Sequence, residues 1–173
     1  MRLFTAICFD DKTKSDLFSV GKAIGEKAKG NFSGKENLHL TLVFIGETER
    51  ISDIEKALSE IEFPAFDYKI SGLGTFDKGI FWAGIEENES LCKLQKIIFE
   101  KLSSIGIETE KRKYIPHITI ARKFLPLQDI DFVKAAEKLP QKKKRATRIS
   151  LMVSERIDGV LTYTEVFSKN LTP

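Results

Sequence analysis

The sequence predicts an α+β protein built from two similar lobes that face each other. The chain of 173 residues contains only two histidines, and each opens the same kind of four-residue pattern, HLTL at 39–42 and HITI at 117–120. The order strand, helix, motif strand, helix, strand is expected twice. Phe9, at the end of the first expected strand, lies 30 residues before His39, and Ile85 lies 32 residues before His117. These matching distances indicate a duplicated architecture.

In the first copy, each expected element rests on β-propensity, on apolar spacing or on a helix-start signal. The expected order is a strand at 2–9, a helix opened by a capping box at 13–16, a loop at 30–34, the motif strand at 38–45, a helix opened by a second capping box at 52–55, and a strand at 66–73. The first helix has its apolar side chains at 17, 20, 24 and 28, and the second at 51, 54, 58 and 61. Gly72 and Gly74 indicate a turn or bulge after the last strand.

The second copy repeats this order. The expected elements are a strand at 80–85, a helix with an apolar stripe from 91 to 105, the motif strand at 116–121, a weaker helix at 129–139 and a strand at 146–155. Gly106 follows the long helix and is expected to cap it. A last strand at 161–168 is expected to pair with the preceding one across Asp158-Gly159.

The composition is that of an ordinary globular protein, with 42% hydrophobic and 31% charged residues. The net charge of +3 is compatible with an anionic ligand without being diagnostic of one. Two cysteines, Cys8 and Cys92, suggest buried thiols in a reducing compartment. The apolar start of the chain is too short for a signal peptide, and no stretch approaches the length of a membrane span. We therefore expect a cytoplasmic protein with one bilobal domain, 1–173, and no membrane partner.

The repeated motif indicates proton-transfer chemistry. His and Thr two residues apart in a strand point to the same face, while the Leu or Ile between them points into the core. Two imidazoles in one cleft can act as base and acid, and the hydroxyls of Thr41 and Thr119 can donate to an oxyanion. Arg122 lies where its guanidinium could reach a phosphate. Together these residues are suited to in-line attack at phosphorus, and this interpretation is favoured over the alternatives of strand propensity for the threonines and a solvated charge for Arg122.

Other chemistry has no support in the sequence. Two histidines without clustered carboxylates or cysteines do not form a usual zinc set, so we expect no metal. No phosphate-loop, dinucleotide or GxSxG motif occurs, so we expect no cofactor and no serine-based acyl transfer. Two basic clusters, one at 111–113 and one at 142–145 with Arg148, could attract an RNA backbone or could be solvated faces. Phe76, Trp82 and Tyr114 are candidates for base stacking, with core packing the favoured fate of Trp82.

These residues resemble a known family. The paired HxTx motifs are similar to those of the 2H phosphoesterase superfamily. Further features resemble its RNA 2′,3′-cyclic phosphodiesterases, also known as 2′–5′ RNA ligases: RLF at 2–4, AI at 6–7, ENL at 36–38, FIGE at 44–47, Pro116, AR at 121–122, Ser154, Gly159 and Tyr163. The resemblance covers nearly the whole chain.

The resemblance implies a pseudo-twofold, bilobal fold in which two antiparallel sheets line a central cleft with helices outside. It implies metal-independent hydrolysis of an RNA 2′,3′-cyclic phosphate end to a 2′-phosphate, with 2′–5′ ligation as the reverse reaction and tRNA halves as a possible substrate. His39 and His117 would be catalytic, and Thr41, Thr119 and Arg122 would bind substrate. We assign His117 as base and His39 as acid, and we expect a monomer without an obligate protein partner. Two alternatives remain open: a non-catalytic RNA-end binding module, and a relative acting on 2′–5′ oligonucleotides or on an ADP-ribose cyclic phosphate.

Overall fold

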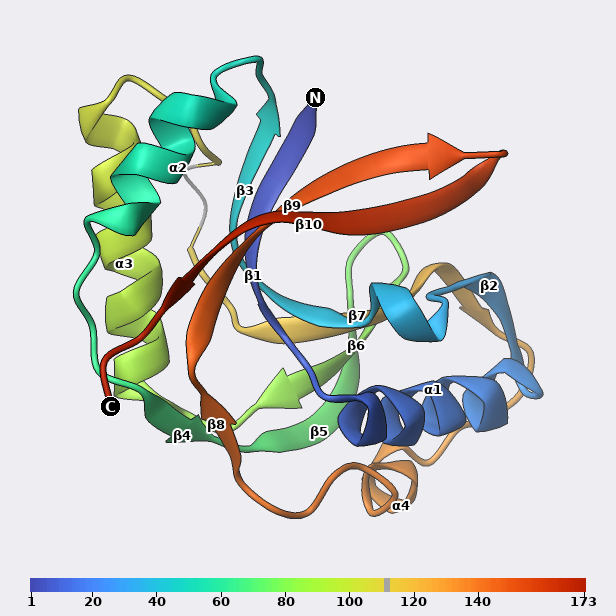
Figure 1. Ribbon diagram of the computed structural model, residues 1–173. Helices are drawn as coiled ribbons and strands as arrows, with labels where there is room; N and C mark the ends of the chain where they lie inside the picture. The colour runs from blue at the N-terminus through green and yellow to red at the C-terminus, as the bar shows by residue number, and fades with distance from the viewer. Residues whose placement is uncertain (111–112) are drawn as a thin grey trace.

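The computed structural model describes residues 1–110 and 113–173, and two four-stranded antiparallel sheets dominate it (Figure 1). Sheet A has the strand order β10-β9-β1-β3, and sheet B has the order β2-β7-β6-β5. Sheet A contains β1 (Arg2–Cys8), β3 (His39–Glu47), β9 (Arg148–Ile157) and β10 (Val160–Asn170). Sheet B contains β2 (Ala28–Phe32), β5 (Ile70–Phe76), β6 (Ile80–Ile85) and β7 (His117–Pro126). Strands β4 (Phe66–Tyr68) and β8 (Lys144–Ala146) pair with each other as a short two-stranded antiparallel sheet.

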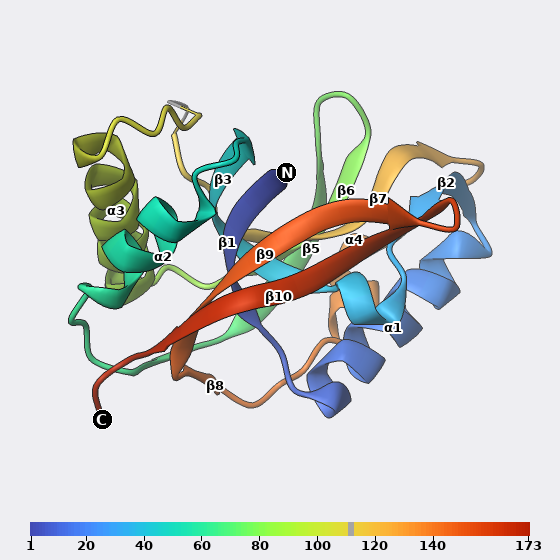
Figure 2. The same cartoon turned by 45° about the horizontal axis from the view of Figure 1, so that its top comes forward.

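The helices form two groups at opposite ends of the molecule (Figures 1 and 2). One group consists of α2 (Ile51–Ser59) and α3 (Glu89–Ser104), and the other of α1 (Asp11–Gly25) and α4 (Phe132–Ala136); a single 3₁₀ turn, η1 (Lys35–Asn37), precedes β3. Although α1 follows β1 of sheet A, it packs on β2 and β7 of sheet B. Conversely, α3 follows β6 of sheet B but packs on β3 of sheet A. Each long helix therefore covers the opposite sheet.

The strands of the two sequence copies are interleaved in the same way. Sheet A combines β1 and β3 of the first copy with β9 of the second, and sheet B combines β6 and β7 of the second copy with β5 of the first. The expectation of an α+β fold with two similar, antiparallel lobes is confirmed. The lobes, however, are not the two halves of the chain. Each of them needs strands from both halves.

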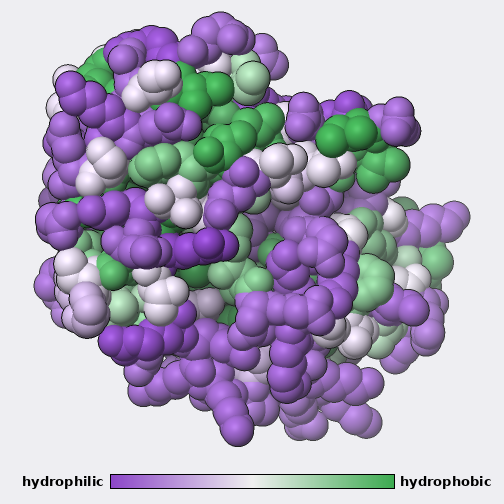
Figure 3. Space-filling view, viewed as in Figure 1, coloured by the Kyte–Doolittle hydropathy of each residue, from purple (hydrophilic) through white to green (hydrophobic). Residues whose placement is uncertain are grey.

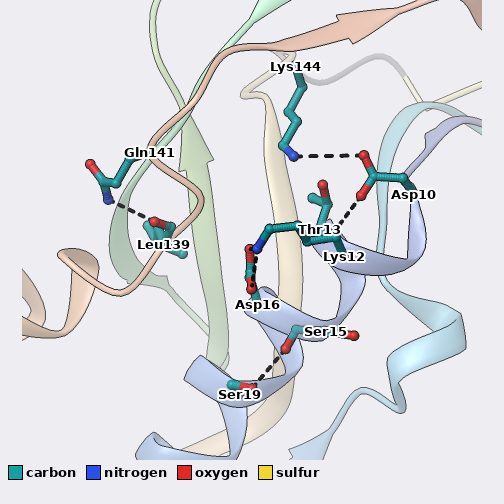
Figure 4. Close-up of polar contacts among 9 residues, drawn as sticks. All are labelled: Asp10, Lys12, Thr13, Ser15, Asp16, Ser19, Leu139, Gln141 and Lys144. Atoms are coloured by element: carbon teal, nitrogen blue, oxygen red, sulfur yellow. Dashed lines mark hydrogen bonds and ion pairs between the residues drawn. The ribbon is translucent and has the colours of Figure 1, made fainter.

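The starts of α1 and α2 differ from the predicted capping boxes. Asp10 is the N-cap of α1, and its carboxylate accepts a hydrogen bond of 2.6 Å from the backbone N–H of Thr13 (Figure 4). This bond lowers the pKa of Asp10, because the backbone donor favours the charged carboxylate. The segment 13–16 is therefore the first turn of α1, with Thr13 buried, rather than its cap. Helix α2 begins at Ile51 without a side-chain cap, so the capping box predicted at 52–55 is also wrong.

Several other expected elements differ in extent. The loop predicted at 30–34 overlaps β2, because Gly30 lets this strand lie close to β7; a Cβ there would be 3.1 Å from the carbonyl oxygen of Arg122. The strands predicted at 66–73 and 146–155 each divide in two, and the helix predicted at 129–139 shortens to the five residues of α4. Gly72, at φ +78, lies where the register of β5 with β6 shifts, so the predicted bulge is confirmed, although β5 continues beyond it.

The expected turns at Gly106 and Asp158-Gly159 are present. Gly106 has φ +75 and follows α3, where its N–H donates to the carbonyl of Ser103. Asp158 and Gly159 both have positive φ and join Ile157 to its partner Val160, as a two-residue hairpin turn requires. The thiol prediction holds only in part: both cysteines are free, but Cys8 is half-buried and Cys92 is exposed. No helix in the described ranges is both long and apolar enough to cross a membrane.

The motif strands place their apolar side chains in the core, as the alternation predicts. Leu40, Leu42, Ile118 and Ile120 are each no more than 2% exposed and belong to a cluster that draws on both sheets and on α1, α2 and α3. A second, smaller cluster lies on the other face of sheet A, the face that carries His39. It contains Phe4, Ala6 and Met152, with the half-buried Cys8, Phe44 and Tyr163 packed against it.

Candidate paired-histidine site

His39 and His117 occupy equivalent positions in the two sheets. Each is the first residue of its strand, His39 of β3 and His117 of β7, and each is half-buried. Strands β3 and β7 contact each other across the boundary between the lobes. In register, His39 lies opposite Cys8 of β1, and His117 lies opposite Gly84 of β6. The fold thus brings together the two motifs that are 78 residues apart in the sequence.

Both imidazoles are anchored by the same type of hydrogen bond. Nδ1 of His39 lies 2.7 Å from the carbonyl oxygen of Asn37, and Nδ1 of His117 lies 2.7 Å from that of Ile115. A carbonyl oxygen can only accept, so each Nδ1 carries the proton. In the neutral form of either ring, Nε2 is then the nitrogen that can take up a proton. This arrangement fixes the tautomer and the orientation that acid–base chemistry needs.

The same-face prediction for His and Thr is confirmed for the first motif. Nε2 of His39 lies 2.9 Å from the hydroxyl of Thr41. Strand alternation gives His117 and Thr119 a common face in β7, and both are half-buried while Ile118 between them is fully buried. The hydroxyl of Thr41 thus lies at His39, and Thr119 shares the face of β7 that carries His117.

Burial and three nearby basic side chains lower the pKa of His39. Its pKa is lowered from 6.5 to about 4, mainly because burial disfavours the charged ring. The charges of Arg122, His117 and Lys14 lower the pKa further, while the hydrogen bond to Asn37 opposes the shift. Arg122 is exposed at the point where β7 pairs with β2, and its charge acts on His39. The site is therefore a region of positive potential, which suits a phosphate.

Sequence reasoning missed Lys14 and the role of Asn37. Lys14 lies in the first turn of α1, and its ammonium group is 2.9 Å from the carboxylate of Glu36, just before β3. The side chain of Asn37 donates to the carbonyl of Leu161 and accepts from the N–H of Tyr163, which ties the start of β3 to β10. The main-chain carbonyl that anchors His39 is thus itself held in place. The sequence could not have indicated these Nδ1 anchors through a polar residue two positions before each histidine, because the apolar Ile115 anchors His117 with its main-chain carbonyl just as Asn37 anchors His39.

Aromatic side chains flank each imidazole. The rings of Phe4 and Tyr163 lie 4.7 Å and 5.1 Å from that of His39, and the ring of Phe76 lies 4.9 Å from that of His117. Trp82 contacts Phe76 with its ring centre 5.2 Å away. The expectation that Trp82 packs in the core is wrong. Its half-buried indole lies across Gly74 and Gly84, where a Cβ would come within 2.5 Å and 3.1 Å of it, next to the site.

The basic clusters contribute less than the sequence suggested. Part of the first cluster, 111–112, lies outside the described residues. In the second region, Lys144 lies 3.8 Å from Asp10 (Figure 4), and Arg145 and Arg148 lie 3.2 Å and 3.3 Å from Asp67 and Glu165. These three cations are paired with carboxylates. The pairing favours the solvated-surface interpretation over a free basic patch for RNA.

The surface is hollowed beside the projecting β9–β10 hairpin, between this arm and the side formed by α1 and β2 (Figure 3). The end of the arm exposes the apolar side chains of Ile157, Val160 and Leu161. Within residues 1–110 and 113–173, no group of three or more His, Cys, Asp or Glu side chains could hold a metal ion. Two antiparallel sheets, each contributing one anchored histidine to a shared cationic site, define a two-lobed paired-histidine (2H) protein.

Comparisons with known proteins identify the family. A family model described as the 2′-5′ RNA ligase superfamily matches residues 22–158, and the chain belongs to this superfamily. An RNA 2′,3′-cyclic phosphodiesterase of Thermotoga maritima is 34% identical over 148 residues, which cover 76% of this chain and 79% of the relative. A protein of the same name from Archaeoglobus fulgidus is 32% identical over 128 residues, 70% of this chain and 72% of the relative.

Solved structures show the same fold. Escherichia coli LigT complexed with 3′-AMP has a TM-score of 0.85 and 23% identity, covering 99% of this chain and 98% of that one. A structure described as a phosphoesterase has a TM-score of 0.84 and 22% identity over the same shares. The family and the fold that the two HxTx motifs predicted are therefore confirmed.

Proposed function

We propose that this protein hydrolyses a terminal RNA 2′,3′-cyclic phosphate to a 2′-phosphate. The observation that carries the proposal is the pair of imidazoles with matching Nδ1 anchors, close enough for the charge of His117 to act on the pKa of His39. Two relatives of about one-third identity are named for this reaction. A site that only bound a phosphate would be better served by Arg or Lys at these positions, because neither titrates near neutrality.

In the proposed reaction, water attacks phosphorus in line with the leaving 3′-oxygen. His117 takes a proton from the water through Nε2 as the new O–P bond forms. The P–O3′ bond breaks, and His39 gives a proton from Nε2 to the 3′-oxygen. One water is consumed, and the products are a 2′-phosphate and a free 3′-hydroxyl. Thr41, Thr119 and Arg122 donate to the non-bridging oxygens, where negative charge develops.

The low pKa of His39 bears directly on this assignment. At about 4, the pKa leaves the ring neutral at neutral pH, which is the state of a base and not of an acid. His39 can act as the acid only if the bound phosphate raises its pKa. Arg122 and Lys14 are cations whose charges lower it, and an anion bound beside them acts in the opposite direction. We therefore keep His39 as the acid, charged by substrate binding.

The same proposal includes the wider expectations. The reaction uses no metal and no cofactor, the partner is an RNA with a 2′,3′-cyclic end such as a tRNA half, and the protein is a cytoplasmic monomer with one bilobal domain, 1–173. The same site would also join a 2′,3′-cyclic end to a 5′-hydroxyl through a 2′–5′ bond: the 5′-hydroxyl replaces water as the nucleophile, its proton goes to the base, and the 3′-oxygen leaves with a proton from the acid. The name of the matched superfamily supports this ligation.

The proposal is tested by product analysis. A short RNA with a 2′,3′-cyclic phosphate end is incubated with the wild type and with a His39→Ala/His117→Ala double variant, and the ends are separated by chromatography and mass. A 2′-phosphate formed only by the wild type supports the proposal. Tight binding without turnover would assign the protein to the RNA-end binding class. Turnover confined to 2′–5′ oligonucleotides or to an ADP-ribose cyclic phosphate would move it to another substrate class.

A further inference from the structure

Two side-chain hydroxyl groups donate hydrogen bonds to main-chain carbonyls at equivalent positions of the two motifs. The hydroxyl of Tyr114 donates to the main-chain carbonyl of Thr41 at 3.0 Å. The hydroxyl of Ser33 donates to the main-chain carbonyl of Thr119, also at 3.0 Å. Tyr114 lies three residues before His117, and Ser33 lies six residues before His39. Each bond therefore joins the segment that leads into one motif to the threonine of the other motif.

The two carbonyls differ in their other support. Strand β7 is an inner strand, flanked by β2 and β6, and the backbone N–H of Ser33 extends the pairing with β2 by donating to Ile120 at 2.8 Å. Strand β3 is the outer strand of sheet A, paired only with β1. A carbonyl on the free side of an outer strand has no partner in the sheet. The Tyr114 hydroxyl gives the carbonyl of Thr41 a partner from outside sheet A.

Tyr114 is suited to hold a fixed position. Its ring is half-buried against the main core, and this burial raises the pKa of its phenol, so the hydroxyl stays a donor across the working pH range. On the other side of the contact, the hydroxyl of Thr41 binds Nε2 of His39. The chain of contacts from the segment before His117 to the ring of His39 thus passes through one residue, Thr41.

We propose that Tyr114 is a positioning residue that sets the separation of the two motif strands and hence of the two catalytic imidazoles. This inference rests on the proposed function, because it matters only if both imidazoles act on one phosphorus atom. In-line transfer requires base, phosphorus and acid to be aligned, and a displacement of about 1 Å can cost on the order of 100-fold in rate. Tyr114 touches no reacting atom. Its effect passes through Thr41.

The test uses Tyr114→Phe, which keeps the ring and removes only the hydroxyl. Tyr68→Phe is the matched control, because Tyr68 is a buried tyrosine on β4, outside the site. For Tyr114→Phe we expect kcat on a nucleoside 2′,3′-cyclic phosphate to fall about 10-fold to 100-fold, with KM within about twofold of the wild type. Ser33→Ala should have a smaller effect, because the backbone N–H of Ser33 still holds its segment to β7.

A second measurement does not depend on turnover. The chain has only two histidines, so each imidazole can be followed by NMR titration. If the lobes separate in Tyr114→Phe, His39 becomes less buried and more distant from His117 and Arg122, and its pKa rises from about 4 toward 6.5. The pKa of His39 in Tyr68→Phe should equal that of the wild type.

The outcomes separate the two proposals. A wild type without turnover on any cyclic phosphate defeats the proposed function, while a raised His39 pKa in Tyr114→Phe would still support the role of Tyr114 in holding the strands. An active wild type together with a Tyr114→Phe variant of unchanged kcat and unchanged His39 pKa overturns the inference. So does a variant whose activity falls only in proportion to its folded fraction, because that is the signature of a purely structural contact.

Discussion

Binding of an anion at the histidine site should charge His39. The perturbation is the addition of sulfate, which remains a dianion between pH 4 and pH 8 and so brings no titration of its own. At pH 6, a free imidazole with a pKa of about 4 is roughly 1% protonated. If His39 is the acid, its pKa in the complex must reach about 7, and close to 0.9 proton is then taken up per site at that pH.

The required shift agrees with simple electrostatics. A rise from about 4 to about 7 is three pKa units, or about 4 kcal/mol of attraction between the anion and the imidazolium. Two unit charges 4 Å apart in a medium of effective dielectric constant about 20 attract each other by about 4 kcal/mol. One bound anion next to Nε2 is therefore sufficient, and neutralisation of Arg122 and Lys14 adds to the shift.

The measurement is an NMR titration of both imidazoles with and without sulfate, with His117→Gln used to assign the two signals. Over the range between the free and bound pKa values, sulfate affinity should fall about tenfold for each unit of rising pH, because binding and protonation of His39 are coupled. His39→Gln should remove this dependence. If His39 stays neutral in the saturated complex at pH 6, it cannot serve as the acid, and the roles of the two histidines must be exchanged.

Four further outcomes are expected. His39→Ala and His117→Ala should each lower kcat by about 10²-fold to 10⁴-fold with the fold retained, and wild-type rates per folded molecule in both would reject acid–base catalysis. On a substrate with a much better leaving group, only the variant that lacks the acid should recover most of its rate. Arg122→Lys should be impaired almost as much as Arg122→Ala, because Lys lacks the forked donor geometry, and full activity in both would make Arg122 a solvated charge. Activity should survive dialysis against EDTA, whereas loss restored by one divalent ion would indicate a different mechanism. The folded pKa of His39 lies below its ordinary value, so the contribution of His39 to stability is complete above pH 6.5 and is lost as pH falls through about 4. The free energy of unfolding should fall by about 3 kcal/mol in total over this window. Chemical denaturation of His39→Gln should show an unfolding free energy that depends less steeply on pH in the same window.

The residues that sequence reasoning placed correctly depend on local alternation. The strand period alone fixes the inward direction of Leu40 and Ile118 and the common face of His39 and Thr41, and both are observed. The helix starts were less predictable, because Asp10 and Thr13 are both good N-cap residues and only the hydrogen bond between them shows which one caps.

The features that could not be predicted are long-range. Nothing local in the sequence indicates that β5 and β9 exchange lobes, or that Tyr114 reaches a carbonyl 73 positions away in the chain. The Nδ1 anchors were missed for a different reason. They use main-chain carbonyls of two unlike residues, Asn37 and Ile115, so the residue types at these positions do not indicate the anchors.

The duplicated fold has to give two similar histidines different chemistry, and the strands outside the repeat provide the difference. The repeat accounts for β3, β1 and β9 in sheet A and for β7, β6 and β5 in sheet B. The fourth strand of sheet A lies at the edge away from the motif strand β3, whereas the fourth strand of sheet B lies next to the motif strand β7. In sheet A, β10 pairs outside β9 and brings Tyr163 onto the ring of His39. In sheet B, β2 pairs instead with the motif strand itself.

The added strands therefore break the symmetry at the histidines. His39 packs against both Phe4 and Tyr163 on an outer strand, and its burial there is the main reason that its pKa is low. An acid–base pair needs environments that differ in how strongly they favour the charged ring. With the Nδ1 anchors identical in both lobes, that difference must come from what surrounds each ring. Replacing Tyr163 by Leu should accordingly raise the pKa of free His39 toward 6.5 without moving either anchor, and an unchanged pKa in that variant would show that β10 is not the source of the asymmetry.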